Sequence, residues 1–168
     1  MIKKIGLYFI FISSIFTISV IIFGIYHYFS FIRFNERTQL AQEFIESVYE
    51  NISTHGYVDF DIIADFEWDN LLLIAPYNNP RTVFEEEGIP WFWGRLNTNI
   101  RYHEGINLLV FLNDKRVIHH IEYPRFMGNL ACYDPIRFGG HVILERNNTR
   151  FQVHDGIGLP EQPCLLPY

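Results

Sequence analysis

The feature that most constrains this chain is an apolar run near its start, which extends from Ile5 to Tyr26 without a titratable side chain. As an α-helix the run would be roughly 33 Å long, enough to cross a hydrocarbon core of about 30 Å. A cleaved signal peptide is the alternative, but its apolar region is usually only about 7–15 residues long and ends in small residues. Because bulky residues follow this run, we expect an uncleaved membrane anchor over residues 1–30, in contact with lipid through residues 5–26.

Aromatic and charged residues around the run indicate how it would lie in a bilayer. Tyr26 and Tyr28 continue it as the aromatic belt found at membrane–water interfaces. Lys3 and Lys4 precede it, and this small bias of positive charge favours a cytoplasmic N-terminus. We therefore expect a single-pass protein whose remaining residues, 31–168, form one exported domain.

Composition bears on the partners of that domain. Asp and Glu outnumber Lys and Arg by 19 to 13, which gives a formal net charge of -6. Binding to a phosphate backbone needs clustered cations, so we expect no nucleic-acid partner. Apolar residues make up 49% of the chain and aromatic residues 17%, which indicates a packed core. An acidic domain of this kind favours a basic protein partner.

The domain begins with a helical pattern. Apolar residues recur every three or four positions from Leu40 to Ile52, with acidic residues between them. Asn35 is a suitable N-cap, and His55-Gly56 is a typical end. We expect an amphipathic helix that packs its apolar stripe on a β-sheet.

A strand and a short helix follow in the predicted order. The apolar run Leu71–Ala75 has the length of a buried strand. Asn79-Pro80 is the N-cap and first turn of a short helix that reaches Glu87, and Gly88 is placed to end it.

Two β-hairpins are predicted in the second half of the chain. Ile106–Leu112 and Arg116–Tyr123 flank an Asn-Asp-Lys turn, and the first of these strands is apolar on both faces, which is typical of a central strand. His141–Glu145 and Arg150–Val153 form the second predicted hairpin. The fold class expected is therefore α+β, with a mainly antiparallel sheet of about four or five strands.

Cys132 and Cys164 are the two cysteines of the chain. In an exported domain they would form a disulfide that ties the C-terminal tail to the body of the fold. Two buried thiols are the alternative. The spacing is not that of a C-x-x-C redox motif.

Histidines suggest a metal site as a rival interpretation. Alternation along the return strand of the first hairpin puts His120 and Glu122 on one face, opposite to Val117. His141 or His154 could complete a three-ligand site of a metal-dependent hydrolase. The chain has no H-E-x-x-H spacing, and scattered surface histidines are the alternative, so we expect no cofactor.

Aromatic and charged residues in the middle of the chain suggest a surface for a protein partner. Tyr and Trp rings and Arg side chains supply most of the binding energy at interfaces, and a run of acids suits a basic partner. The candidate binding residues are Tyr77, Glu85, Glu86, Glu87, Trp91, Trp93 and Arg125. Burial over the sheet is the alternative for the tryptophans.

Several short motifs between Phe66 and Phe126 form a layout of their own: Trp68-Asp69, Pro76-Tyr77, Trp91, Asn107-Leu108-Leu109-Val110-Phe111 and Tyr123-Pro124-Arg125. This layout resembles that of small membrane-anchored or lipidated bacterial envelope proteins of unassigned function. The resemblance implies a location in the bacterial envelope and no known reaction. Together with the N-terminal apolar run, it leads us to expect the inner membrane. The lipid-attachment cysteine usual in such proteins is missing here, which fits a transmembrane helix instead.

Together these patterns predict a membrane-tethered, extracytoplasmic protein-binding module, with an immunity or inhibitor protein against a basic partner as one concrete version. The metal-dependent hydrolase is one alternative. A structural subunit of an envelope complex is another. No catalytic motif stands out from the sequence.

Overall fold

A computed structural model describes residues 2–91, 96, 98–154 and 163–168; the side chains of residues 2–16, 29–38, 135 and 138 lie outside the description. The chain divides into two units, Met1–Leu40 and Ala41–Tyr168. The second unit holds both β-sheets, so the fold is α+β with antiparallel sheets, as predicted.

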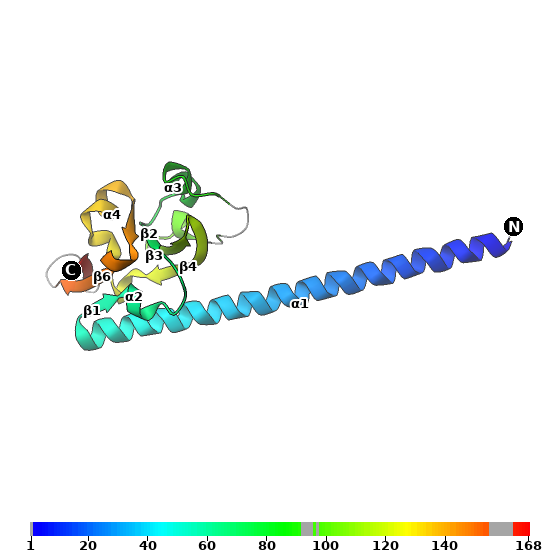
Figure 1. The fold of residues 1–168 in the computed structure, drawn as a ribbon, viewed down its shortest axis with the longest axis horizontal. Coiled ribbons are helices and arrows are strands. Elements are labelled where there is room, and N and C mark those ends of the chain that lie inside the picture. Colours follow the sequence, from blue (N-terminus) through cyan, green and yellow to red (C-terminus); the bar gives the residue numbers. More distant parts are fainter. Residues whose placement is uncertain (1, 92–95, 97, 155–162) are drawn as a thin grey trace. The chain divides into compact units, whose positions relative to one another are not determined.

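The first unit is helical throughout its described residues. Helix α1 runs from Ile2 to His55 and is drawn from blue to cyan in Figure 1. The helix start that we predict at Asn35 is therefore wrong; no Pro or Gly between Ile25 and His55 interrupts the helix. Gly56, with φ of 73°, ends it. Within the described part of the chain, no helix offers a stretch both long and apolar enough for a membrane crossing.

A four-stranded antiparallel sheet forms the centre of the second unit (Figure 1). Its strands are β2 (Asn70–Ile74), β3 (Ile106–Asn113), β4 (Arg116–Pro124) and β5 (His141–Glu145), in the order β4-β3-β2-β5. The predicted first hairpin is confirmed as β3 and β4, and β3 is central as expected.

A second sheet has three strands in the order β1-β6-β7. They are β1 (Tyr57–Asp59), β6 (Arg150–His154) and β7 (Cys164–Pro167). The second predicted hairpin is wrong, because β5 pairs with β2 whereas β6 pairs with β1 and β7. Residues 146–149, which join β5 to β6, do not form the predicted turn. In this segment the Thr149 hydroxyl donates to Arg146 O, and the Thr149 carbonyl accepts from Phe60 N.

Short helices join these strands. They are α2 (Phe60–Ile63), α3 (Pro80–Glu86), α4 (Asp134–Gly139) and the 3₁₀ turns η1 (Ile100–Tyr102), η2 (Arg125–Met127), η3 (Leu130–Cys132) and η4 (Arg146–Asn148). Helix α3 confirms the prediction: Asn79 Oδ1 accepts from Arg81 N at 3.2 Å.

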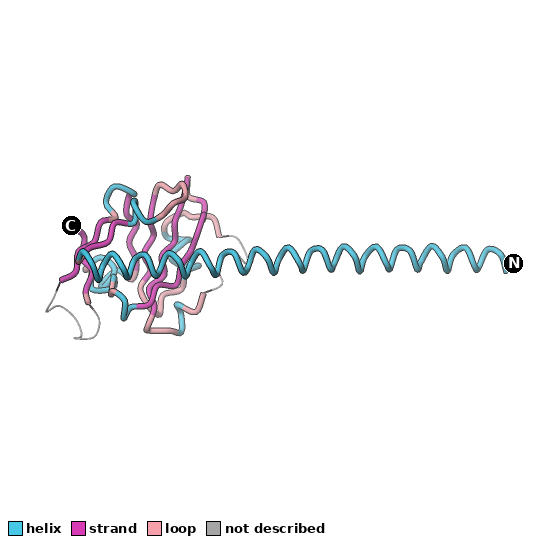
Figure 2. The backbone as a smooth tube through the Cα atoms, turned by 90° about the horizontal axis from the view of Figure 1, so that it is seen from below, coloured by secondary structure: helices cyan, strands magenta, loops and turns pink. Residues whose placement is uncertain are grey.

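The four-stranded sheet is buried on both faces. Leu71, Leu73 and Phe111 face a core shared with the last turns of α1 and with the three-stranded sheet. Leu72 and Val110, which alternate with them, face a second core under α3. Figure 2 shows the last turns of α1 lying over the strands.

One irregularity changes which face a side chain meets. A break in register between Phe111 and Leu112 lets β4 bulge, so that Leu112 pairs with Val117. Val117 consequently packs on the core under α3, whereas Ile121 and Tyr123 pack on the core beside α1. The simple alternation that we predict for this strand is therefore wrong at Val117.

A polar pair lies within the core beside α1. Asn107 on β3 is paired in register with Tyr123 on β4, and both residues are buried. The Asn107 amide and the Tyr123 hydroxyl have no hydrogen-bond partner among the described residues. Burial strongly raises the pKa of the Tyr123 hydroxyl.

Candidate functional site

One end of the four-stranded sheet gathers residues from three separate parts of the chain. Strand β2 ends, β3 begins and β4 ends there, because Ile74 pairs with Leu108 and Ile106 pairs with Pro124. The segments just beyond these strand ends carry Tyr77, Tyr102, Glu104, Arg125 and Phe126. We call these five residues the sheet-end surface.

Hydrogen bonds hold the three segments together. The Tyr77 hydroxyl donates to Glu104 Oε2 at 3.1 Å, and Arg125 Nη1 donates to Glu104 O at 2.8 Å. Backbone bonds run from Tyr77 N to Ile100 O at 2.8 Å and from Arg125 N to Gly105 O at 2.9 Å. Glu104 is therefore the link between the end of β2 and the end of β4.

Three aromatic rings of the sheet-end surface are open to solvent. Tyr77 is 61% exposed, Tyr102 is 78% exposed and Phe126 is 60% exposed. The Arg101 guanidinium lies 5.6 Å from the centre of the Tyr102 ring, within the range of a cation–π interaction. Exposed rings beside arginines have the composition of the residues that dominate binding at protein interfaces.

Tyr77 adopts an unfavourable backbone conformation. Its φ is 66°, a left-handed region that bulky side chains rarely occupy. Such conformations cost about 1–3 kcal/mol and are concentrated at functional sites. Desolvation and the hydrogen bond to Glu104 raise the pKa of the Tyr77 hydroxyl, so the phenol stays protonated as a donor.

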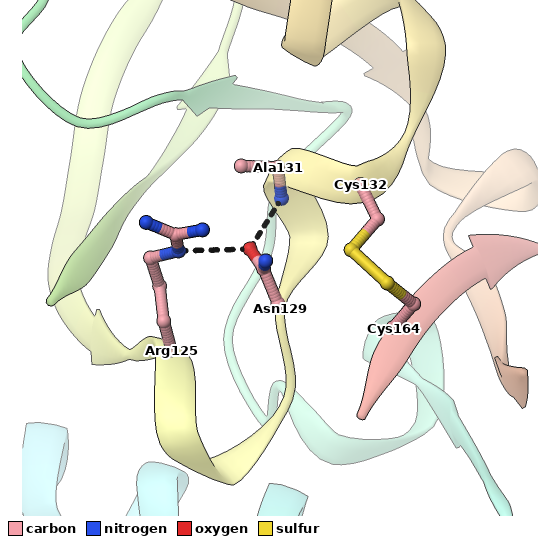
Figure 3. The surroundings of a disulfide bond; sticks show 5 residues. All are labelled: Arg125, Asn129, Ala131, Cys132 and Cys164. Carbon is pink, nitrogen blue, oxygen red and sulfur yellow. Dashed lines mark hydrogen bonds between the residues drawn. A yellow bond between two sulfur atoms is a disulfide. The ribbon is translucent and has the colours of Figure 1, made fainter. Parts of the chain in front are cut away.

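The disulfide that we predict between Cys132 and Cys164 is present, with Cα atoms 5.7 Å apart, and joins η3 to β7. Asn129 lies between this bond and Arg125 (Figure 3). Its Oδ1 accepts from Arg125 Nε at 2.9 Å and from Ala131 N at 3.0 Å. Its backbone N donates to Pro163 O and its carbonyl accepts from Leu165 N. Arg125 is thus a positioning residue that joins the sheet-end surface to the disulfide-bonded tail.

The predicted acidic run lies at the end of α3. Glu85 forms an exposed ion pair with Arg81 at 3.0 Å. His141 Nε2 lies 2.9 Å from Glu87 Oε1 and 4.0 Å from Glu86 Oε2. The three glutamates therefore contact groups of this chain and do not join the Tyr77 network.

Of the two tryptophans predicted to bind a partner, Trp91 and Trp93, the structure describes only Trp91. The ring of Trp91 packs at 5.4 Å on Phe84 against the core under α3, which is the burial alternative. Trp93 lies outside the described residues. Of the candidate binding residues, the structure places Tyr77 and Arg125 together.

The candidate metal ligands do not converge. His120 and Glu122 lie on β4 and His141 lies on β5, at opposite edges of the sheet and roughly 14 Å apart. His154 belongs to the three-stranded sheet. Glu122 Oε1 instead accepts from Thr98 Oγ1 at 2.7 Å. The described part of the chain contains no cluster of three His, Cys, Asp or Glu side chains arranged to hold a metal ion.

Sequence reasoning did not single out Tyr102 or Glu104 for binding. Tyr102 precedes β3 in a segment that carries no motif of its own. Tyr123, another tyrosine close to a strand end, is fully buried. The usable signal was only positional: aromatic residues lie beside the predicted ends of three strands.

No protein-family model, no curated protein and no solved structure matches this chain.

Proposed function

We propose that this chain is a membrane-tethered module that binds a protein partner through the sheet-end surface. The observation that carries the proposal is the set of three exposed rings, Tyr77, Tyr102 and Phe126, on segments that hydrogen bonds hold together at one end of the central sheet. The hydrogen bond to Glu104 orients the Tyr77 ring, so this ring loses little conformational entropy on binding and more of its contact energy appears as affinity.

The tether is supported by the first unit. Residues 5–26 lack titratable side chains. Ile21, Ile22 and Phe23 are 60%, 61% and 65% exposed, which suits a helix that is surrounded by lipid. We propose that this helix crosses the inner membrane of a bacterium once, with the N-terminus in the cytoplasm.

Export of the α+β domain is supported by its disulfide. Bonds such as Cys132–Cys164 persist in oxidising compartments and are rare in the cytosol. The proposed partner is therefore a protein that meets the outer side of the membrane. The formal net charge of -6 favours a basic one, and an immunity or inhibitor protein against a basic toxin is the most concrete version.

Capture of the partner tests the binding part of the proposal. The full chain is purified in detergent from membranes of the cells that produce it. The proteins recovered with the wild type, with Phe126→Ser and with Ile62→Ser are then compared. Both side chains are exposed, by 60% and 76%, but Ile62 lies on α2, away from the sheet-end surface. We expect a protein recovered with the wild type to be lost in Phe126→Ser alone. Equal recovery from both variants would contradict the assignment of this surface.

Labelling of an added cysteine tests the location. Ile62→Cys places a thiol at an exposed position of the domain, and the native cysteines remain bonded. A membrane-impermeant maleimide should label it in intact cells. Labelling only after lysis would place the domain in the cytoplasm and overturn this part of the proposal.

A further inference from the structure

Strand β5 is an edge of the four-stranded sheet, because it pairs with β2 alone in the order β4-β3-β2-β5. It is apolar on both faces: Val142 and Leu144 pack on the core beside α1, and Ile143 packs on the core under α3. Residues 141–144 nevertheless stay half-buried, whereas residues 71–74 of β2, which lie opposite them, are buried. An apolar strand with one open side is a position at which another strand can pair.

The hydrogen bonds to β2 show which backbone groups of β5 point outwards. Ala75 N donates to Gly140 O at 2.8 Å, just beyond one end of the β2–β5 pairing. Arg146 N donates to Asp69 O at 2.9 Å, just beyond the other end. Since bonded and non-bonded pairs alternate along antiparallel strands, the even-numbered residues of β5 bond to β2. The residues whose N–H and C=O groups point away from β2 are His141, Ile143 and Glu145. No described residue forms a backbone hydrogen bond with these three.

The other sheet edges are protected against pairing. Strand β4 carries a bulge, and its Glu122 side chain accepts a hydrogen bond from Thr98 Oγ1. Strand β7 ends in Pro167, and β1 is only three residues long. Bulges, prolines and short edge strands are common means of preventing a sheet edge from pairing with another chain. Strand β5 contains neither proline nor lysine, and its register with β2 runs without a bulge.

The sequence of β5 is complementary to itself in the antiparallel direction. With Ile143 opposite Ile143 of a second copy, His141 faces Glu145 of that copy. Val142 likewise faces Leu144, so both apolar faces continue across the junction. The odd-numbered residues, whose backbone groups point outwards, then lie opposite one another and exchange hydrogen bonds. A shift by one residue would place them opposite residues whose N–H and C=O groups already bond to β2.

The two ends of β5 also suit this register. Glu145 is exposed and has no ion pair among the described residues. His141 Nε2 lies 2.9 Å from Glu87 Oε1, so Nδ1 is the ring nitrogen that a carboxylate of the second copy can meet. The pair of Glu145 and His141 occurs twice in the symmetric arrangement, once on either side of Ile143.

We propose that this chain forms a symmetric dimer in which β5 pairs antiparallel with β5 of a second copy, in register at Ile143. The two four-stranded sheets then join into one continuous sheet. A second copy is the occupant because the hydrogen-bonding groups, the apolar faces and the end residues of β5 all match their own reverse order. The strand lies outside the five residues of the sheet-end surface, so the dimer goes beyond the proposed function.

Cross-linking through an added cysteine tests the register. The full chain is produced in membranes as Ile143→Cys or as Glu145→Cys and is oxidised mildly, while Cys132 and Cys164 stay bonded to each other. Residues that face each other in a hydrogen-bonded antiparallel pair have Cα atoms about 5.5 Å apart, within the range of a disulfide. The two positions 145 would be more than about 13 Å apart, since four residues offset them along the strands.

We expect at least about five times more covalent dimer from Ile143→Cys than from Glu145→Cys. Position 145 is the more exposed of the two, so random collision would favour the control instead. Equal cross-linking at the two positions, or none at position 143, would overturn the proposal. A covalent adduct of Ile143→Cys with a different protein would show another occupant of this edge and would overturn it as well.

Proline at position 143 tests the backbone bonds. Ile143→Pro removes an N–H that points away from β2, so the bonds between β2 and β5 are kept. Ile143→Val is the control, because it shortens the same side chain and keeps the N–H. Light scattering after size-exclusion chromatography in a non-ionic detergent should show dimers of the wild type and of Ile143→Val. We expect the dissociation constant of Ile143→Pro to be at least about tenfold higher.

A folded Ile143→Pro variant that dimerises as well as the wild type would place the contact elsewhere and overturn the proposal. The cross-linking result does not depend on this variant. The sheet-end surface is unchanged in every variant of β5, so its own test with Phe126→Ser stands apart.

Discussion

The Tyr77 hydroxyl donates to Glu104 Oε2 at 3.1 Å, and this bond joins two residues that are 27 positions apart in the chain. It links the end of β2 to the segment before β3 and orients an exposed ring that the backbone holds in a left-handed conformation. The combination of strain, exposure and a fixed ring is what makes this end of the sheet a candidate binding surface.

Tyr77→Asn should separate binding from stability. Asn tolerates positive φ better than most residues, so the exchange removes the ring without adding backbone strain. We expect the free energy of unfolding to change by less than about 1 kcal/mol, while partner binding weakens about tenfold or more. Urea unfolding and a binding titration measure the two effects. Full affinity in a folded Tyr77→Asn variant would exclude the ring from the interface.

Gly128→Ala should destabilise the loop that carries Arg125. Gly128 has φ of 151°, and a Cβ there would lie 2.6 Å from Leu165 Cδ1 and 3.1 Å from the Tyr123 hydroxyl. We expect a loss of about 2 kcal/mol or more in unfolding free energy. Gly139→Ala is the matched control, because a Cβ at Gly139 meets nothing within 4 Å and its φ is not positive. Equal effects of the two exchanges would mean that the loop does not pack as described.

Loss of the disulfide should lower stability substantially. Cys132 and Cys164 are 32 positions apart, and the chain-entropy relation gives about 3.7 kcal/mol for closing such a loop. We expect Cys132→Ala with Cys164→Ala to lower the unfolding free energy by a few kcal/mol. The wild type in reductant should match the double variant, which should itself be insensitive to reductant. A wild type that unfolds at the same urea concentration with and without reductant would contradict the bond.

Tyr123 should make the fold sensitive to alkali. An unfolded tyrosine ionises near pH 10, but burial raises the pKa of the folded Tyr123 hydroxyl well above this. Above pH 10 the folded state therefore binds more protons than the unfolded state, and stability falls as pH rises. Tyr123→Phe should reduce this fall.

The same exchange should also help at neutral pH. The Tyr123 hydroxyl has no hydrogen-bond partner among the described residues, so its removal should raise the unfolding free energy by about 1 kcal/mol at pH 7. Tyr49→Phe, at an exposed tyrosine, is the control and should change stability by less than about 0.5 kcal/mol. A clear loss of stability in Tyr123→Phe would show that the hydroxyl is satisfied in solution.

Elements formed by neighbouring residues could be predicted from the sequence. Helix α3 is specified by Asn79-Pro80 at its start, and the β3–β4 hairpin by two apolar strands around a polar turn. The partition into two sheets could not, because β1 is only three residues long and pairs with β6 across most of the chain. Pairing over such separations leaves no local pattern. The bulge that turns Val117 to the other face is equally invisible in the alternation of residue types.

The candidate site shows the same limit. Tyr77 and Arg125 could be selected individually, because polar aromatics and arginines are common at interfaces. Their meeting through Glu104 depends on the order of β2, β3 and β4, which only the folded structure supplies. The glutamates at 85–87 were chosen for their charge, but partners within the chain, Arg81 and His141, already contact them.

The most direct test of the central claim is photo-cross-linking in intact cells. A photoreactive residue replaces Tyr102, which is 78% exposed on the sheet-end surface, or Ile62, which is 76% exposed on α2. We predict a discrete adduct with one protein from position 102, reduced when Tyr77→Asn is added, and none from position 62. The same adducts from both positions, or none from position 102, would contradict a binding role for this end of the sheet.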